Sequence, residues 1–174
     1  LVPLAPLCTY FFADGTRLES SDDARRFGAE IAGATSDTSE SLERYLRHCE
    51  RIYDVAADLF LWKSLREPST YLSGSVLRAL PRLWRLDALR TMDAANRSYF
   101  RDPRVVQLFN RYATYNGSSP FRVPATLAII PHVEYGFGGY AVQGGIYAIP
   151  SALARLAAAR GVRFFQGTRV SGVS

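Results

Sequence analysis

One long stretch of the chain, residues 38 to 65, carries side chains at the three- and four-residue spacing of an amphipathic α-helix. Asp37 with Glu40 resembles a capping box at its start, and Pro68 lies beyond its end. A helix of this length needs a core for its apolar face, so the stretch predicts a fold built around one long helix. The residues with this spacing are Leu42, Tyr45, Leu46, Cys49, Ile52, Tyr53, Ala56, Leu59, Phe60 and Lys63.

The composition supports a packed domain. Of the 174 residues, 48% are hydrophobic and 21% are charged, which allows a sizeable core and argues against disorder. Aromatic residues make up 13% and are spread along the chain, which favours aromatic-lined surfaces. Cys8 and Cys49 lack the spacing of metal ligands, so we predict no metal site and two small core residues in a reducing compartment.

The remaining patterns predict shorter helices and a small sheet. Asp14-Gly15 lies between β-prone runs at 9–12 and 16–19, which indicates a hairpin, and Asp102-Pro103 is a typical helix opening. Single helices are predicted over residues 24–33, 102–115, 125–133 and 149–161. Two further short helices are predicted within residues 72–95, with a break between them at Pro81, and strands are predicted over residues 162–165 and 168–173. With a strand around Tyr140, these elements predict an α+β fold, mainly helical with a small, mostly antiparallel sheet.

Side chains suited to acid or base chemistry are few. His132 and Glu134 lie two apart after an apolar run, and polar groups at the end of an element explain them better than a catalytic pair. His48 faces away from the apolar stripe of its helix, so we expect it to be solvated. The sequence contains no GxSxG, Walker, HExxH or zinc motif, and it therefore indicates no catalytic residue.

Glycines concentrate between residues 136 and 145, which predicts that the backbone there lies very close to another group. Gly144 and Gly145 precede a predicted helix, where they could cradle a phosphate or a flat ring, or simply form a turn.

Residues 77–90 alternate leucines and Trp84 with arginines in a chain of net charge +5. This pattern suits either a solvated face or a patch that inserts beside anionic lipid head groups. No apolar run of spanning length and no signal peptide is present, so a cytoplasmic, peripheral membrane location is expected. The residues predicted to contact the membrane are Arg82, Trp84, Arg85 and Arg90.

From residue 100 to residue 162 the sequence closely resembles the carotenoid desaturase (phytoene dehydrogenase) family. In that family, the block resembling residues 111–120, RYATYNGSSP, belongs to the substrate side, and the block resembling Gly144-Gly145 leads back to the flavin-binding domain. Residues 7–86 fit more loosely, although their elements come in the expected order. Some desaturases carry an acidic residue near arginines in the stretch resembling 72–83, and this chain has none there.

The resemblance implies part of a two-domain flavoprotein that introduces C=C bonds into a phytoene-like carotenoid, with FAD as cofactor and a quinone or oxygen as electron acceptor. Residues 1–143 would be a substrate-side segment and 144–174 the start of the return to the FAD-binding domain. Because the family's GxGxxG is missing and the ends look internal, we expect a fragment that alone binds no FAD and is inactive.

A hydrocarbon substrate needs mainly an apolar tunnel, which accounts for the scarcity of acids and bases. Gly144 and Gly145 are the predicted cofactor contacts. The predicted substrate contacts, most of which equally suit a plain core, are Tyr112, Tyr115, Asn116, Phe121, Leu127 and Ile130.

Three alternatives remain open. The chain could belong to another flavin amine oxidase superfamily member: an amine oxidase, or a carotenoid ketolase or isomerase. It could also be a non-enzymatic lipid-binding module. Nucleic acid is not an expected partner.

Overall fold

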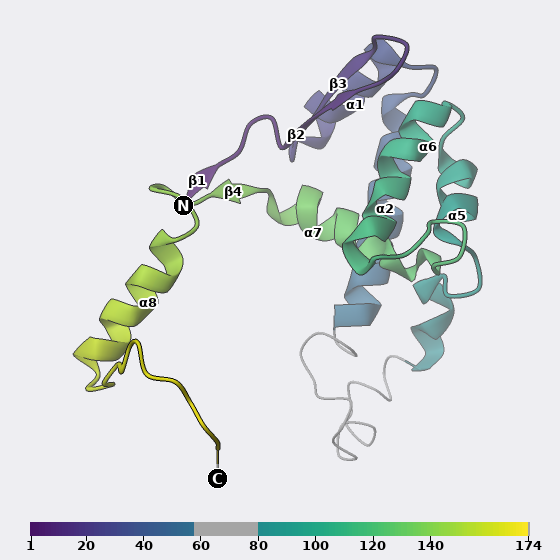
Figure 1. Ribbon diagram of the computed structural model, residues 1–174. Helices are drawn as coiled ribbons and strands as arrows, with labels where there is room; N and C mark the ends of the chain where they lie inside the picture. Colours follow the sequence, from purple (N-terminus) through teal and green to yellow (C-terminus); the bar gives the residue numbers. More distant parts are fainter. Residues whose placement is uncertain (58–79, 174) are drawn as a thin grey trace. The chain divides into compact units, whose positions relative to one another are not determined.

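The computed structural model describes residues 1–57 and 80–173 (Figure 1). The chain divides into two compact units, a larger one of Ala5–Gly139 and a smaller one of Leu1–Leu4 with Tyr140–Ser174. The described parts are mainly helical and contain two antiparallel sheets of two strands each, which confirms the α+β prediction. The functional boundary between residues 143 and 144 stays a prediction.

The larger unit begins with the hairpin expected from Asp14-Gly15. Strand β2 (Cys8–Phe11) pairs antiparallel with β3 (Arg17–Ser20). Gly15 adopts φ of 84°, a left-handed conformation that glycine accepts without steric cost, and the Asp14 carboxylate accepts a hydrogen bond from the Thr16 N–H at 2.9 Å. The local turn chemistry therefore sets the hairpin.

The first two helices also follow their sequence signals, with one correction. Helix α1 (Ala24–Ala34) is capped by Asp23, and α2 (Ser39–Ala56) is the long central helix. The N-cap of α2 is Thr38, so the capping box predicted for Asp37 is wrong. The Asp37 carboxylate instead accepts hydrogen bonds from the backbone N–H groups of Arg101 and Asp102, at 2.8 and 3.0 Å. The predicted extension of this helix beyond residue 57 lies outside the described residues.

A second correction concerns Pro81. It lies within the 3₁₀ helix η2 (Leu80–Leu86) and does not break it, because a proline in the first turn of a helix removes no required N–H. The break comes between residues 87 and 91, where Asp87 adopts φ of 51°, and it is followed by α5 (Met92–Tyr99). The part of this prediction on residues 72–79 lies outside the described residues.

The helices after residue 102 form as expected. Asp102 caps α6 (Pro103–Asn110), which continues into the 3₁₀ helix η3 (Arg111–Asn116). The apolar run from residue 125 is also helical, as η4 (Ala125–Ala128) and α7 (Ile129–Phe137).

The core of the larger unit combines aliphatic side chains with a group of packed aromatic rings. Helix α2 packs against α1, α5, α7 and η2 (Figure 1). The rings of Phe100 and Phe109 stack at 4.9 Å with an angle of 6°, and Tyr45 lies 4.4 Å from Phe109. Cys49 is buried among them as a free thiol, which burial keeps protonated by raising its pKa to about 12.

The smaller unit has little interior of its own. Strand β1 (Val2–Pro3) pairs antiparallel with β4 (Tyr140–Ala141), and α8 (Ala148–Ala159) has no buried residue. The strands predicted at 162–165 and 168–173 are wrong, because residues 162–173 form no regular secondary structure. A β-prone run forms a strand only beside a partner strand, and none lies beside it in the described chain.

Candidate functional site

The most elaborate polar cluster in the larger unit surrounds an Arg111–Glu134 ion pair. We call it the tyrosine cluster, and its members come from β2, η3 and α7: Tyr10, Arg111, Tyr112, Tyr115, Glu134 and Tyr135. Arg111 Nη2 donates to Tyr10 Oη at 2.9 Å and to Glu134 Oε1 at 3.2 Å. The guanidinium also lies 4.5 Å from the ring centroid of Tyr112, close enough for a cation–π interaction. The cluster therefore ties three separate elements together.

Tyr10, Tyr112 and Tyr135 of this cluster are neutral. Burial raises the pKa of Tyr10 to about 12, and it raises the pKa values of Tyr112 and Tyr135 well above the usual range. Tyr112 donates its one O–H to Glu134 Oε1 at 2.8 Å, and Tyr135 Oη lies 3.0 Å from Tyr112 Oη, close enough for the Tyr135 O–H to donate to it. The one negative charge of Glu134 thus balances the one positive charge of Arg111.

The two carboxylate oxygens of Glu134 accept different numbers of hydrogen bonds. Oε1 accepts from Arg111 and Tyr112, whereas Oε2 receives only the Tyr115 hydroxyl at 3.4 Å. The Glu134 side chain is 20% exposed and Tyr115 is 61% exposed, so this edge of the cluster reaches the surface. Among the described residues, Oε2 retains capacity to accept another hydrogen bond.

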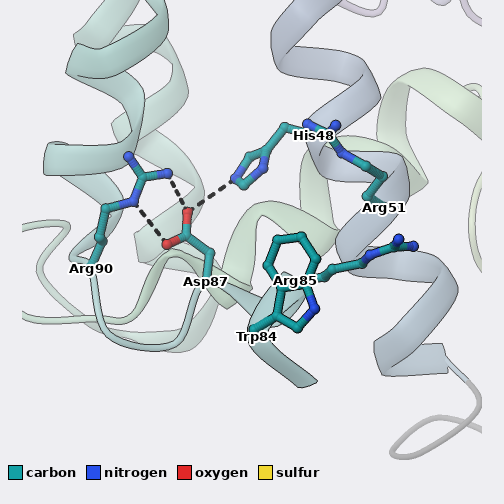
Figure 2. Close-up of a pocket in the computed structure, with 6 residues that line it drawn as sticks. All are labelled: His48, Arg51, Trp84, Arg85, Asp87 and Arg90. Carbon is teal, nitrogen blue, oxygen red and sulfur yellow. Dashed lines mark hydrogen bonds and ion pairs between the residues drawn. The ribbon is translucent and has the colours of Figure 1, made fainter. Parts of the chain in front are cut away.

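A second arrangement lies between α2 and the segment that follows η2. Figure 2 shows a cavity of about 370 Å³ lined by His48, Arg51, Trp84, Arg85, Asp87 and Arg90. Asp87 is its centre: Arg90 donates to both of its oxygens, at 2.8 and 2.5 Å, and His48 Nε2 lies 3.2 Å from Oδ2. The left-handed backbone at Asp87 places its carboxylate between these two partners.

His48 is buried, so the prediction of a solvated side chain is wrong. It lies three residues after Tyr45 and four before Ile52, which puts it beside the buried face of α2. Burial lowers the pKa of His48, and the charges of Arg90 and Arg51 act in the same direction against the opposing charge of Asp87. The neutral imidazole is therefore the favoured form in the fold.

The residues predicted to contact a membrane divide into two kinds. Arg82, Trp84 and Arg85 are exposed, with the Arg85 guanidinium 5.4 Å from the Trp84 ring. Arg90 instead bonds Asp87, and it donates to Ser98 Oγ at 3.2 Å. Although its side chain is 43% exposed, these hydrogen bonds tie Arg90 to the fold, and this sets it apart from the other three. The start of the predicted stretch, residues 77–79, lies outside the described residues.

Comparison with known proteins identifies the family of the chain, although no protein-family model matches it. The chain is 40% identical, over 90% of its length, to a 1-hydroxycarotenoid 3,4-desaturase of Flavobacterium sp.. It is 34% identical over 99% of its length to a hydroxyneurosporene desaturase of Cereibacter sphaeroides, and 38% over 70% to a zeta-carotene-forming phytoene desaturase of Myxococcus xanthus. The chain belongs to the carotenoid desaturase family. The chain spans 32%, 35% and 23% of the lengths of these three relatives, respectively.

The predicted substrate contacts occupy different environments. Tyr112 is fully buried, and Leu127 and Ile130 are partly buried. Tyr115 and Phe121 are more than 60% exposed, and Asn116 is exposed beside them in sequence. Tyr112 and Tyr115 both bond Glu134, so part of this set gathers at the tyrosine cluster. Their role in substrate binding stays a prediction.

Gly144 and Gly145 form a turn before α8, with φ of 82° and 86°. No atom of the described residues lies within 4 Å of the position a Cβ would take at either glycine, whereas at Gly136 a Cβ would lie 3.3 Å from the His132 ring, so the close approach expected for residues 136–145 is seen only at its start. The Gly145 and Ala148 N–H groups already donate to Val142 and Gly145 carbonyls, at 2.9 and 3.1 Å. The turn alone does not fit a flavin diphosphate, because two of its backbone donors are in use.

The remaining acid/base candidates also separate. Glu134 joins Arg111, whereas His132 packs 4.5 Å from the Tyr53 ring of α2. His132 and Glu134 therefore do not form an acid/base pair, which agrees with the expectation from the sequence. Sequence reasoning missed Tyr10 and Arg111, because the Tyr10–Arg111 and Arg111–Glu134 contacts span 101 and 23 residues, separations that no local spacing reveals. No group of metal-binding side chains occurs in residues 1–57 and 80–173.

Proposed function

We propose that the chain is the substrate-side section of an FAD-dependent carotenoid desaturase that introduces C=C bonds into a carotenoid. The observation that supports this most is the 40% identity to a carotenoid desaturase over 90% of the chain. Since the chain spans about a third of that relative, the activity belongs to a longer protein. The relatives' names include hydroxylated carotenoids and phytoene, and both classes are candidate substrates here.

In this proposal the chain supplies binding and position. A carotenoid offers few polar groups, so apolar side chains must hold the reacting carbon in place. Tyr115, Phe121, Leu127 and Ile130 offer apolar surface of graded exposure on η3, η4, α7 and the connecting loop. In this proposal FAD is held mainly by parts of the enzyme beyond this chain, with Gly144 and Gly145 as predicted contacts, and a quinone or oxygen accepts the electrons.

The test of this function uses the full-length enzyme with FAD and carotenoid-loaded liposomes. Desaturation lengthens the conjugated system, so the absorbance of the carotenoid should shift to longer wavelength. No shift with phytoene, neurosporene or hydroxyneurosporene would contradict the proposal. Peroxide formation with amines would indicate an amine oxidase, and carotenoid binding without turnover would indicate a lipid-binding module.

We further propose that the surface around η2 docks on a membrane. The exposed apolar side chains Leu83, Trp84 and Leu89 lie close in sequence to the exposed cations Arg82 and Arg85. A long hydrocarbon stays in lipid, because each CH₂ transferred to water costs about 0.8 kcal/mol. No helix in the described parts is long and apolar enough to cross a bilayer. A surface patch would give access to the substrate without one.

Liposome co-sedimentation of the full-length enzyme tests the docking surface. The double variant Arg82→Gln with Arg85→Gln should bind anionic liposomes more weakly, and salt should weaken wild-type binding. Arg90 is left unchanged because it holds Asp87. The matched control is Arg101→Gln with Arg122→Gln, an equal change of charge at two other exposed arginines. Equal binding by both double variants would refute this surface.

A further inference from the structure

The tyrosine cluster contains a hydrogen-bond acceptor that the fold does not fully use. We propose that Glu134, assisted by Tyr115, binds a hydroxyl group at one end of the carotenoid and so determines specificity for hydroxylated over unsubstituted substrates. This inference rests on the proposed function and adds to it a recognition site for the polar end of the substrate.

The first argument is the unequal bonding of the carboxylate. An ionised carboxylate has about four acceptor positions. Glu134 Oε1 accepts at 2.8 and 3.2 Å, whereas Oε2 receives a single bond of 3.4 Å from an exposed tyrosine. A ligand hydroxyl donating to Oε2 would make a charge-assisted bond, which is about twice as strong as a neutral one.

The second argument is charge. Arg111 lies 3.2 Å from Glu134, so the pair carries no net charge, and the surrounding tyrosines are neutral. A carboxylate or phosphate ligand would be repelled by Glu134 at the open edge, and an ammonium ligand would be opposed by Arg111. A neutral donor such as a hydroxyl suits the site best.

The third argument is the apolar surface around this acceptor. Ile130 lies one turn before Glu134 on α7 and therefore on the same side of the helix. Phe137, one turn after it, is 53% exposed, and the ring of Tyr115 is largely exposed. A single acceptor beside apolar side chains matches a molecule that is hydrocarbon except for a terminal hydroxyl.

The experiment compares two substrates that differ by one hydroxyl, neurosporene and hydroxyneurosporene, with the FAD-loaded full-length enzyme in liposomes. Wild type should show higher kcat/KM for hydroxyneurosporene. Glu134→Gln should reduce that preference roughly tenfold, since a site built to bond a hydroxyl discriminates through that bond. Tyr115→Phe should reduce it by a smaller factor. Tyr147→Phe, which removes an exposed hydroxyl in the smaller unit, should leave the ratio unchanged.

The outcomes separate the inference from the proposed function. If Glu134→Gln lowers kcat/KM equally for both substrates, Glu134 only ties the fold together and the inference is wrong, while desaturation stands. Equal use of both substrates by wild type also overturns it. If wild type acts on neither of these substrates nor on phytoene, the proposed function fails, and the inference with it; activity on phytoene alone overturns only the inference. Should Glu134→Gln not fold, Tyr115→Phe decides, because its exposed hydroxyl makes only long bonds, at 3.4 and 3.5 Å.

Discussion

Helices α2 and α8 carry apolar side chains at the same helical spacing, yet only one of them has an interior to face. Helix α2 buries eight residues in the larger unit, whereas α8 buries none (Figure 1). On α8, Leu153 and Leu156 are 60% and 56% exposed. An apolar pattern thus identifies the face that can be buried, and tertiary contacts decide whether it is. The same substitution should therefore have very different effects in the two units.

The largest effect is expected at the centre of the larger unit. Phe109 is fully buried and packs against Tyr45 and Phe100. Phe109→Ala should lower the free energy of unfolding by about 3–5 kcal/mol, because it removes buried surface and leaves a cavity. Urea denaturation measures this loss. The control Phe121→Ala, at a site 63% exposed, should change it by less than about 0.5 kcal/mol. Similar losses would mean that the core lies elsewhere.

A smaller effect is expected at the Asp102 cap, which joins α6 to the loop before α2. Its carboxylate accepts from the Ser36 N–H at 3.1 Å and from the Arg104 N–H at 2.9 Å. Asp102→Ala should cost about 2 kcal/mol, since it removes the cap of α6 together with the other hydrogen bonds of a carboxylate that is itself buried. Asp23→Ala removes the cap of α1, whose bonds are exposed, and should cost less. An equal cost for both variants would contradict this ranking.

The Asp102 contribution should also depend on pH. Hydrogen bonds from Arg104 lower the pKa of Asp102 well below its usual range, against the opposing effect of burial. A group whose pKa is lower in the folded state stabilises the fold fully above its unfolded pKa of about 3.9, and this stabilisation is lost as the pH falls. The difference in Tm between wild type and Asp102→Ala should therefore be constant from about pH 5 to 7 and shrink below about pH 4. A constant difference at all pH values would refute the linkage.

Much of the fold was predictable because its signals are local. The Asp14-Gly15 turn, the Asp102 cap and the spacing of α2 each depend on residues within one or two turns of one another. These features appear in the structure where the sequence put them. Resemblance to a family added the substrate side, which no local pattern would have indicated.

The wrong predictions arise where contacts between residues far apart in the sequence determine the structure. Asp37 has the chemistry of a cap, but it bonds backbone groups 64 and 65 residues away, and Thr38 takes the cap position. His48 was expected to be solvated because it faces away from the apolar stripe of its helix, but it is buried beside Asp87. The Arg111–Glu134 pair joins η3 to α7 across 23 residues. Only the folded chain shows these contacts.

His48 provides a third test, smaller in effect than the cap. Burial, with help from Arg90 and Arg51, lowers its pKa, so the stability due to the neutral ring is present above the unfolded pKa of about 6.5 and is lost as the pH falls. Wild type should lose more stability between pH 7 and pH 5 than His48→Gln does, as measured by urea denaturation. The control His132→Gln should retain the part of this loss of stability between pH 7 and pH 5 that is due to His48. Equal losses in His48→Gln and wild type would mean that the Asp87 charge cancels the effect of burial, and a smaller loss in wild type would mean that it outweighs burial.

The smallest effect is expected on α8, and it decides whether the comparison of the two helices holds. Leu153→Ala and Leu42→Ala are the same change in two helices, so helix propensity contributes equally to both. Leu42 is fully buried, and its loss should cost about 2–5 kcal/mol, whereas Leu153→Ala should cost less than about 0.5 kcal/mol in the 174-residue chain. The proposed function implies a longer enzyme, in which further residues would cover α8. Leu153→Ala should therefore become costly there, with a lowered Tm for the full-length protein. A large cost in the 174-residue chain would show that α8 already has an interior, and no cost in either protein would show that its apolar face stays exposed.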